Sequence, residues 1–171
     1  MSSFLSPAYR SGRRRAKILP LRSLMAALDR QKKTGKKVVF TNGCFDVLHV
    51  GHTRYLQKAR SMGDRLVIGV NSDASVRQLK KGPGRPVNSE NARAEVLAAL
   101  ECVDYIVIFG EPTPLRLIQN LRPDVLVKGG DWAKHKIVGA EAVESYGGRV
   151  KTVPFVQGFS TTRTLAKIQR L

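Results

Sequence analysis

Two histidines, His49 and His52, stand three residues apart on either side of Gly51. Side chains at positions i and i+3 of a helix lie about 5 to 6 Å apart on one face, so both imidazoles can reach the same group. The glycine has no Cβ, which lets an anion approach the backbone closely. The residue types and their spacing therefore predict a site in which two imidazoles bind one phosphoryl group.

The segment that carries these histidines is predicted to cross from a strand to a helix. Residues 37–41 form a short β-branched and aromatic run, and residues 51–62 show a helical pattern. The start of such a helix presents unpaired backbone N–H groups and a positive dipole end to an anion. Two histidines at a helix start can also simply cap it or lie on its solvated face, but the position after a strand favours the phosphate site.

Strand and helix patterns alternate along the rest of the chain. Strands are expected at residues 37–41, 65–70, 104–109, 124–128 and 149–153. Helices are expected at residues 20–30, 51–62, 89–100, 113–121, 139–146 and 160–170. This alternation predicts an α/β fold: a single Rossmann-like domain whose five-stranded parallel sheet carries helices on both faces and binds ligands at the carboxyl ends of the strands.

Length and cysteine content favour one compact domain in a reducing compartment. The chain has 171 residues, 42% of them hydrophobic, which suffices for an ordinary single core. Cys44 and Cys102 are its two cysteines, and no Cys-x-x-Cys pair suggests structural zinc. No long apolar segment predicts a membrane contact, and the start of the chain lacks the apolar core of a secretory signal. We therefore expect a cytoplasmic protein.

Positive charge is concentrated at the start of the sequence. The formal net charge is +17, and residues 1–37, with eleven Lys or Arg and one Asp, account for +10 of it. We expect residues 1–19 to form a basic, disordered arm and residues 20–171 to form the domain. No interleaved aromatics or nucleic-acid module accompany the charge, so nucleic acid is not the favoured partner. The arm and helix 20–30 could instead serve a homodimer contact.

Two further segments fall where the sheet is expected to bind ligands. Residues 128–132, Lys-Gly-Gly-Asp-Trp, follow strand 124–128, and paired glycines either let the backbone approach a ligand or form a tight turn beside a packed Trp132. Ser160 opens the last helix, where it can cap the helix while the same helix start binds an anion.

Three further sites along the chain carry charged side chains. Arg93 lies on helix 89–100, whose Ala- and Leu-rich remainder reads as buried, so its guanidinium needs an anion there. Lys80 and Lys81 belong to a Lys-, Gly- and Pro-rich stretch that reads as a flexible loop. Asp46 precedes helix 51–62 and is expected to support the histidines, to bind backbone amides at the turn or to help bind magnesium.

Residues 43–52 resemble the Gly-x-Phe-Asp-x-x-His-x-Gly-His signature of the cytidylyltransferase-like nucleotidyltransferases, which join a nucleoside monophosphate to a phosphorylated small molecule. The resemblance runs from about Val38 to the C-terminus. Further segments are similar to the heptose 1-phosphate adenylyltransferase branch of the family: residues 71–73, 85–87, 93–100, 127–132 and 158–162. This branch transfers AMP from ATP to D-glycero-β-D-manno-heptose 1-phosphate, releasing pyrophosphate and giving ADP-heptose for the lipopolysaccharide inner core.

The resemblance implies roles for particular residues. The catalytic candidates are His49, His52 and Lys128. The nucleotide-binding candidates are Thr41, Asn42, Gly43, Cys44, Phe45, His49, Gly51, His52, Lys80, Lys81, Arg93, Lys128, Gly129, Asp131, Ser160, Thr161 and Thr162. The substrate-binding candidates are Asp46, Asn71, Asp73 and Trp132. Magnesium is expected to be bound mainly through the ATP phosphates.

Other functions remain open at this stage. Glycerol-3-phosphate cytidylyltransferases share the histidine motif, but they typically carry Arg-Thr-Glu where this sequence has Phe155-Val156-Gln157. A nucleotide- or anion-binding module without turnover is a non-enzymatic alternative. A fragment of a class I aminoacyl-tRNA synthetase is opposed by the short length and by the lack of a Lys-Met-Ser-Lys-Ser type loop. The chain has no room for a sugar kinase, so we expect a separate heptose kinase.

Overall fold

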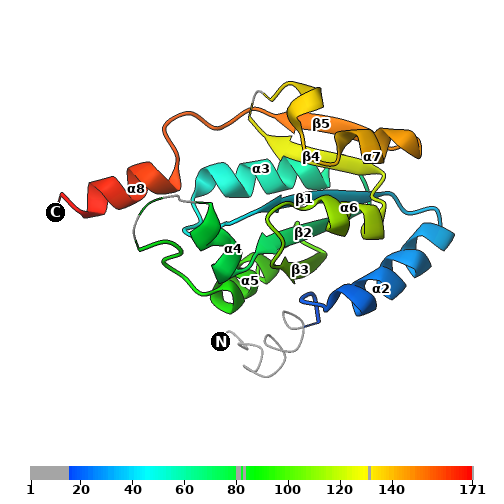
Figure 1. Cartoon of the computed structure of the whole chain (residues 1–171), viewed down its shortest axis with the longest axis horizontal. Helices are drawn as coiled ribbons and strands as arrows, with labels where there is room; N and C mark the ends of the chain where they lie inside the picture. Colours follow the sequence, from blue (N-terminus) through cyan, green and yellow to red (C-terminus); the bar gives the residue numbers. More distant parts are fainter. Residues whose placement is uncertain (1–15, 80–81, 83, 131, 171) are drawn as a thin grey trace, which may run out of the picture.

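The computed structural model describes residues 16–79, 82, 84–130 and 132–170. A parallel sheet of five strands forms its centre, in the order β3-β2-β1-β4-β5 (Figure 1). The strands are β1 (Val38–Gly43), β2 (Arg65–Asn71), β3 (Tyr105–Phe109), β4 (Val125–Gly129) and β5 (Arg149–Val153). Each overlaps its expected range, and the predicted fold class is confirmed.

The order of the strands determines where a ligand can bind. β1 pairs with β2 from Val38↔Arg65 to Gly43↔Val70, and on its other edge it pairs with β4. Successive connections thus run outward from β1 to β2 and β3 on one side, and the chain then crosses back to β4 and β5 on the other. A crevice opens outside the carboxyl ends of the strands where this direction reverses. The ends of β1 and β4 therefore border the expected site.

Helices cover both faces of the sheet, as predicted. Their bounds are α2 (Leu21–Lys33), α3 (Val50–Arg60), α4 (Asp73–Gln78), α5 (Glu90–Ala98), α6 (Leu115–Leu121), α7 (Ala140–Ser145) and α8 (Thr161–Ile168), with a 3-10 turn at Lys134–Lys136. Buried side chains of α2, α6 and α7 pack in one core cluster, and those of α3 and α5 pack in the other. None of these helices is long and apolar enough to cross a membrane.

Helix α4 was missed in the sequence analysis, which treated its residues as part of a loop. The Ser72 side chain caps it by accepting a hydrogen bond from Ser75 N, and Asp73 supplies a favourable negative charge in the first turn. A serine followed by an acidic residue is a recognisable helix start, but the six-residue helix is too short to show a periodic pattern.

Residues at the start of the described chain pack along the sheet edge. Ile18 forms a parallel bridge with Ile106 of β3, and Leu19 N donates a hydrogen bond to Ile106 O at 2.9 Å. The Lys17 ammonium reaches Leu100 O at 3.1 Å. Residues 17–19, which were assigned to the basic arm, are therefore part of the packed structure, while residues 1–15 lie outside the described residues.

Helix α8 extends away from the sheet at the C-terminal end of the chain (Figure 1). None of its residues is buried. Its first turn is joined to the histidine segment, because Thr161 Oγ1 donates a hydrogen bond to Val47 O at 3.2 Å. The start of α8 therefore lies beside the loop that leads into α3.

Candidate active site

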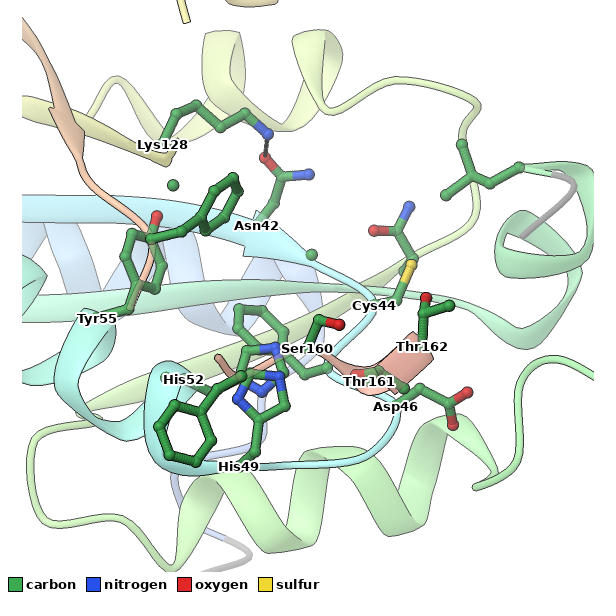
Figure 2. Close-up of a pocket in the computed structure, with 18 of the residues that line it drawn as sticks. Asn42, Cys44, Asp46, His49, His52, Tyr55, Lys128, Ser160, Thr161 and Thr162 are labelled. Atoms are coloured by element: carbon green, nitrogen blue, oxygen red, sulfur yellow. Dashed lines mark hydrogen bonds between the residues drawn. The ribbon is translucent and has the colours of Figure 1, made fainter. Parts of the chain in front are cut away.

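A large pocket lies at the carboxyl ends of β1 and β4, at the point where the strand order reverses (Figure 2). Its volume is about 1260 Å³, and its lining includes the end of β1, the first turns of α3, the end of β4 and the chain from Pro154 to Arg163. Pockets for single small ligands usually measure about 300 to 1,000 Å³. This pocket is therefore larger than the usual pocket for one small ligand.

The two histidine rings lie against each other on one side of this pocket (Figure 2). Their centroids are 3.9 Å apart and their planes differ by 26°. His49 is the N-cap of α3, with an extended φ of -143°, so it is not itself helical. The expected common face is achieved because the His49 ring folds back over the helix start.

The His49 ring is held in its neutral form. Burial lowers its pKa from the usual 6.5, so the ring carries no charge at pH 7. Its Nδ1 atom is buried and has no hydrogen-bond partner among the described residues. A neutral imidazole still has one N–H donor, which can bind a phosphoryl oxygen.

Gly51 is required by the His49 ring itself. A Cβ atom at Gly51 would lie 2.9 Å from His49 Nδ1 and 3.4 Å from Phe159 Cβ. The ring of Phe159 is stacked near that of His49, with their centroids 6.4 Å apart. Whereas the sequence analysis attributed this glycine to close approach of a phosphate, the structure shows that it also makes room for the imidazole.

Asp46 anchors the chain between α4 and α5. Its buried carboxylate pairs with the Arg85 guanidinium and accepts hydrogen bonds from Val87 N at 2.8 Å and Asn88 N at 2.9 Å. Burial alone would raise the pKa of Asp46, but these two backbone hydrogen bonds and Arg85 outweigh it and hold the pKa below its usual value. Of the three roles considered, the carboxylate performs amide binding, at a distant segment rather than at its own turn.

The Arg93 side chain is fully buried and joins three segments of the chain. It donates to Cys44 O at 2.5 Å, to Asn71 O at 2.8 Å and to Asn88 O at 3.0 Å. The anion that its burial required is the Asp73 carboxylate, at 2.7 Å. Arg93 therefore clamps the loops behind the pocket, and it does not line the pocket surface where a nucleotide would contact it.

Contacts between neighbouring strands organise the other side of the pocket. Lys128, from β4, donates a hydrogen bond to Asn42 Oδ1, from β1, at 2.8 Å (Figure 2). The Tyr55 hydroxyl lies 2.6 Å from Thr41 Oγ1 and donates to Val127 O at 3.2 Å. Burial raises the pKa of Tyr55 to about 12, so it remains a neutral donor. Helix α3 is thereby joined to both strands.

Most of the expected site residues come together in this pocket. Those that line it are Asn42, Gly43, Cys44, Phe45, Asp46, His49, Gly51, His52, Asn71, Lys128, Gly129, Trp132, Ser160, Thr161 and Thr162. Three expected residues that are described do not line it: Thr41, Asp73 and Arg93, all of which are engaged in the internal contacts given above. Lys80, Lys81 and Asp131 lie outside the described residues.

The sequence analysis missed several residues of the pocket wall: Tyr55, Arg85, Lys136, Phe155, Phe159 and Arg163. Tyr55 follows His52 by one helical turn, and Phe155 follows the carboxyl end of β5, so position relative to predicted elements could have indicated both. The described part of the lining contains four cations, Arg85, Lys128, Lys136 and Arg163, and one carboxylate, Asp46. Such a positive pocket attracts phosphorylated ligands.

A protein-family comparison agrees with this geometry. The model of the cytidylyltransferase-like family matches residues 40–164, which include both histidines and the start of α8. The chain therefore belongs to the cytidylyltransferase-like family and is a nucleotidyltransferase.

Two relatives with high sequence identity to this chain carry the same name. The bifunctional protein HldE of Geotalea uraniireducens is 61% identical over 154 residues, which are 90% of this chain and 31% of that protein. HldE of Geobacter sulfurreducens is 55% identical over 174 residues, or 98% of this chain and 35% of that protein. The chain thus spans about a third of the length of these relatives.

Solved structures share the fold. A lipopolysaccharide core biosynthesis protein from Thermoplasma volcanium matches with a TM-score of 0.58 and 30% identity, covering 71% of this chain and 98% of that chain. A pantoate-beta-alanine ligase from Francisella tularensis matches with the same TM-score at 15% identity, over 90% of this chain and 78% of that chain. The second match shows only the common fold.

Replacing Arg93 tests its role as a clamp. We expect Arg93→Met to lower the free energy of unfolding by about 3 to 5 kcal/mol, because it leaves the buried carbonyl oxygens and the Asp73 carboxylate without their donor. Urea unfolding measures the change. The control is Arg77→Met on the exposed side of α4, which should stay within about 0.5 kcal/mol of the parent. A stable Arg93→Met protein that loses only nucleotide affinity would contradict the clamp.

Replacing Gly51 separates site geometry from stability. In Gly51→Ala the new Cβ displaces the His49 ring, and we expect tripolyphosphate to bind about 10-fold more weakly because one hydrogen-bond donor is misplaced. Stability should not fall, since alanine is favoured over glycine within a helix by about 1 kcal/mol. Quenching of Trp132, the single tryptophan, reports binding because it lines the pocket.

A matched control is Gly110→Ala, where the nearest atom to a new Cβ is Ser72 Oγ at 3.6 Å. Gly110 does not line the pocket, so its replacement should leave tripolyphosphate affinity unchanged. Equal affinities in the Gly51 and Gly110 variants would show that the position of the His49 ring does not matter.

Proposed function

We propose that this nucleotidyltransferase transfers AMP from ATP to D-glycero-β-D-manno-heptose 1-phosphate, giving ADP-heptose and pyrophosphate for lipopolysaccharide inner-core synthesis. The observation that carries the proposal is the stacked pair His49 and His52 at the start of α3, in a large, cation-lined pocket. The similarity to HldE proteins and to a lipopolysaccharide core biosynthesis protein supports the choice of pathway.

The reaction needs no nucleophile from the protein. An oxygen of the sugar phosphate attacks the α-phosphorus of ATP, a new P–O bond forms, and the bond from the α-phosphorus to the bridging oxygen breaks as pyrophosphate leaves in line. The attacking phosphate is already ionised at neutral pH, so a general base would add little. Catalysis then consists of holding two anions together and stabilising the charge that grows on the α-phosphoryl oxygens.

The residues of the pocket fit this task. His49, His52 and Lys128 are the proposed catalytic donors. The Ser160 side chain accepts a hydrogen bond from Arg163 N at the start of α8, which leaves its O–H group to donate to a phosphate. Backbone N–H groups at the starts of α3 and α8 add further donors. Lys80 and Lys81 are proposed to fold over the triphosphate.

Magnesium is expected to bind through the phosphates. The described residues contain no group of three or more His, Cys, Asp or Glu side chains that could hold a metal ion. Asp46, the one carboxylate of the described lining, is already engaged by Arg85 and by backbone N–H groups. A nucleoside triphosphate carries magnesium on its own oxygens, with water completing the octahedral shell, and so needs few protein ligands.

The source of the sugar phosphate, the oligomeric state, the cellular location and the domain division are also proposals. The heptose 1-phosphate is proposed to come from a sugar kinase. A homodimer could form through α2 and the basic arm, and the proposed location is the cytoplasm. The division into an arm at residues 1–19 and a domain at residues 20–171 is kept as a proposal, with the qualification that residues 17–19 pack on β3.

The test of function is pyrophosphate release in the presence of magnesium, with ATP or CTP as donor and heptose 1-phosphate or glycerol 3-phosphate as acceptor. We expect turnover with ATP and heptose 1-phosphate alone. Turnover restricted to CTP and glycerol 3-phosphate would assign the protein to the cytidylyltransferase branch instead. No turnover with any pair, although nucleotides bind, would favour a binding module.

Replacing His52 tests the phosphate-binding pair. We expect His52→Ala to lower turnover by about 10² to 10³-fold, because one preorganised donor to the α-phosphoryl group is lost. The control is His135→Ala, since His135 is exposed and does not line the pocket. Both variants should keep the circular dichroism spectrum of the parent. Near-parental turnover of a folded His52→Ala protein would refute the role of this histidine.

A further inference from the structure

Phe155 exposes an unusual amount of aromatic surface inside the pocket. It lies two residues after the end of β5, lines the pocket, and is 74% exposed, the largest value among the exposed large hydrophobic residues of the described chain. An aromatic side chain contributes to folding mainly through the area that it buries. This ring buries little, so its position on the wall of a pocket indicates a ligand contact.

The inner side of the Phe155 ring rests on the paired glycines at the end of β4. A Cβ atom at Gly129 would lie 3.1 Å from the ring, and one at Gly130 would lie 2.6 Å from it. Gly130 also has a φ of +100°, and its N–H donates to Val153 O at 2.8 Å, which ties the end of β4 to the end of β5. The glycine pair thus leaves space for the Phe155 ring, and a side chain at either position would take up that space.

The glycine pair is connected to the phosphate end of the pocket. Tyr55 Cε2 would lie 3.6 Å from a Cβ atom at Gly129, so the tyrosine touches the same strand end. Tyr55 is three residues beyond His52 on α3, which corresponds to about 4.5 Å along the helix axis. For a nucleotide whose α-phosphate contacts the histidines, Tyr55 and the end of β4 are therefore within reach of the ribose and base.

The other exposed rings of the pocket are arranged differently. Phe159 lies against His49, and its Cβ atom lies beside Gly51, so it shapes the phosphate end. Trp132 is 54% exposed at the pocket wall, and among the described residues no ring contact or hydrogen bond of its side chain is found. One side of the Phe155 ring packs against Gly129 and Gly130, and the rest of the ring is exposed in the pocket. An aromatic ring held in this way can stack with a ligand.

We propose that the base of the nucleotide stacks on the exposed face of Phe155, and that this ring favours purines over pyrimidines. The inference rests on the proposed transfer of a nucleotide by this pocket and adds the residue that contacts the base. Every base presents a π face to an aromatic ring, and a purine covers more of the ring than a pyrimidine does. The Phe155 ring bears no charge, so base stacking does not involve the pocket cations.

Isothermal titration calorimetry with ATP, CTP and inorganic tripolyphosphate tests this contact. We expect Phe155→Ala and Phe155→Leu to bind ATP about 10- to 100-fold more weakly, which is the range produced by removing one stacking ring. Tripolyphosphate affinity should stay within about twofold, because it has no base to stack. Phe155→Tyr should bind ATP like the parent, and the preference for ATP over CTP should fall in the Ala and Leu variants.

A control variant and two outcomes make the test decisive. Val96→Ala removes a side chain that is 52% exposed on α5 and does not line the pocket, so it should bind all three ligands like the parent. Unchanged or tighter ATP binding by Phe155→Ala would overturn the proposal, and so would an equal loss of tripolyphosphate binding. Thermal unfolding verifies that each variant is folded, and Phe155→Leu retains bulk if the alanine variant is unstable.

Pyrophosphate release by the parental protein distinguishes a failure of the stacking proposal from a failure of the proposed reaction. If it releases pyrophosphate from ATP with heptose 1-phosphate while Phe155→Ala binds ATP normally, only the stacking contact is wrong. If no acceptor supports turnover but the ring still governs ATP affinity, the nucleotide contact stands and the proposed reaction is wrong.

Discussion

The buried guanidinium of Arg93 is the interaction on which the geometry of the pocket depends. A fully buried charge is tolerated only when it is paired and hydrogen-bonded, and Arg93 meets this requirement with carbonyl groups at the ends of β1 and β2 and with the Asp73 carboxylate. Because one rigid group holds both loops, the end of β1 cannot move without the end of β2. The loop that leads to the histidines starts from this fixed point.

Asp46 extends the same network toward the segment before α5. Asn88 is shared by both charges: its carbonyl oxygen accepts from Arg93, and its backbone N–H and side-chain amide bind Asp46. The two buried charges thus close a ring of contacts around the end of β1. Asp46 and Arg93 therefore hold loops of the pocket wall together, while Lys128, Lys136 and Arg163 contribute positive charge to the pocket lining.

Two glycines that the sequence pattern assigns to ligand approach are also needed to accommodate a neighbouring ring. Gly51 makes room for the His49 ring, and Gly130 makes room for Phe155. In each case a ring occupies the space that a side chain would take and presents another surface to the pocket. The glycines therefore affect ligand binding through the rings that they seat as well as through backbone approach.

The amino-acid sequence by itself determined the local structure and the place of the site. Hydrophobic periodicity located all five strands and the helices of seven residues or more, together with the six-residue α7, because these patterns repeat over neighbouring residues. The spacing of His49 and His52 after a strand indicated the part of the pocket where phosphate binding is proposed. The other six-residue helix among the described residues, α4, was not predicted, because so short a segment shows too little hydrophobic periodicity.

Only the tertiary structure decided which partner each polar or aromatic side chain has. Arg93 meets Cys44 from 49 positions away, Asp46 meets Asn88 from 42 positions away, and Phe155 rests on Gly130 across two adjacent strands. A residue type states what a side chain requires, such as an anion for a buried arginine, but many groups in the chain can supply it. The choice among them is made by packing distant segments together, which no local pattern records.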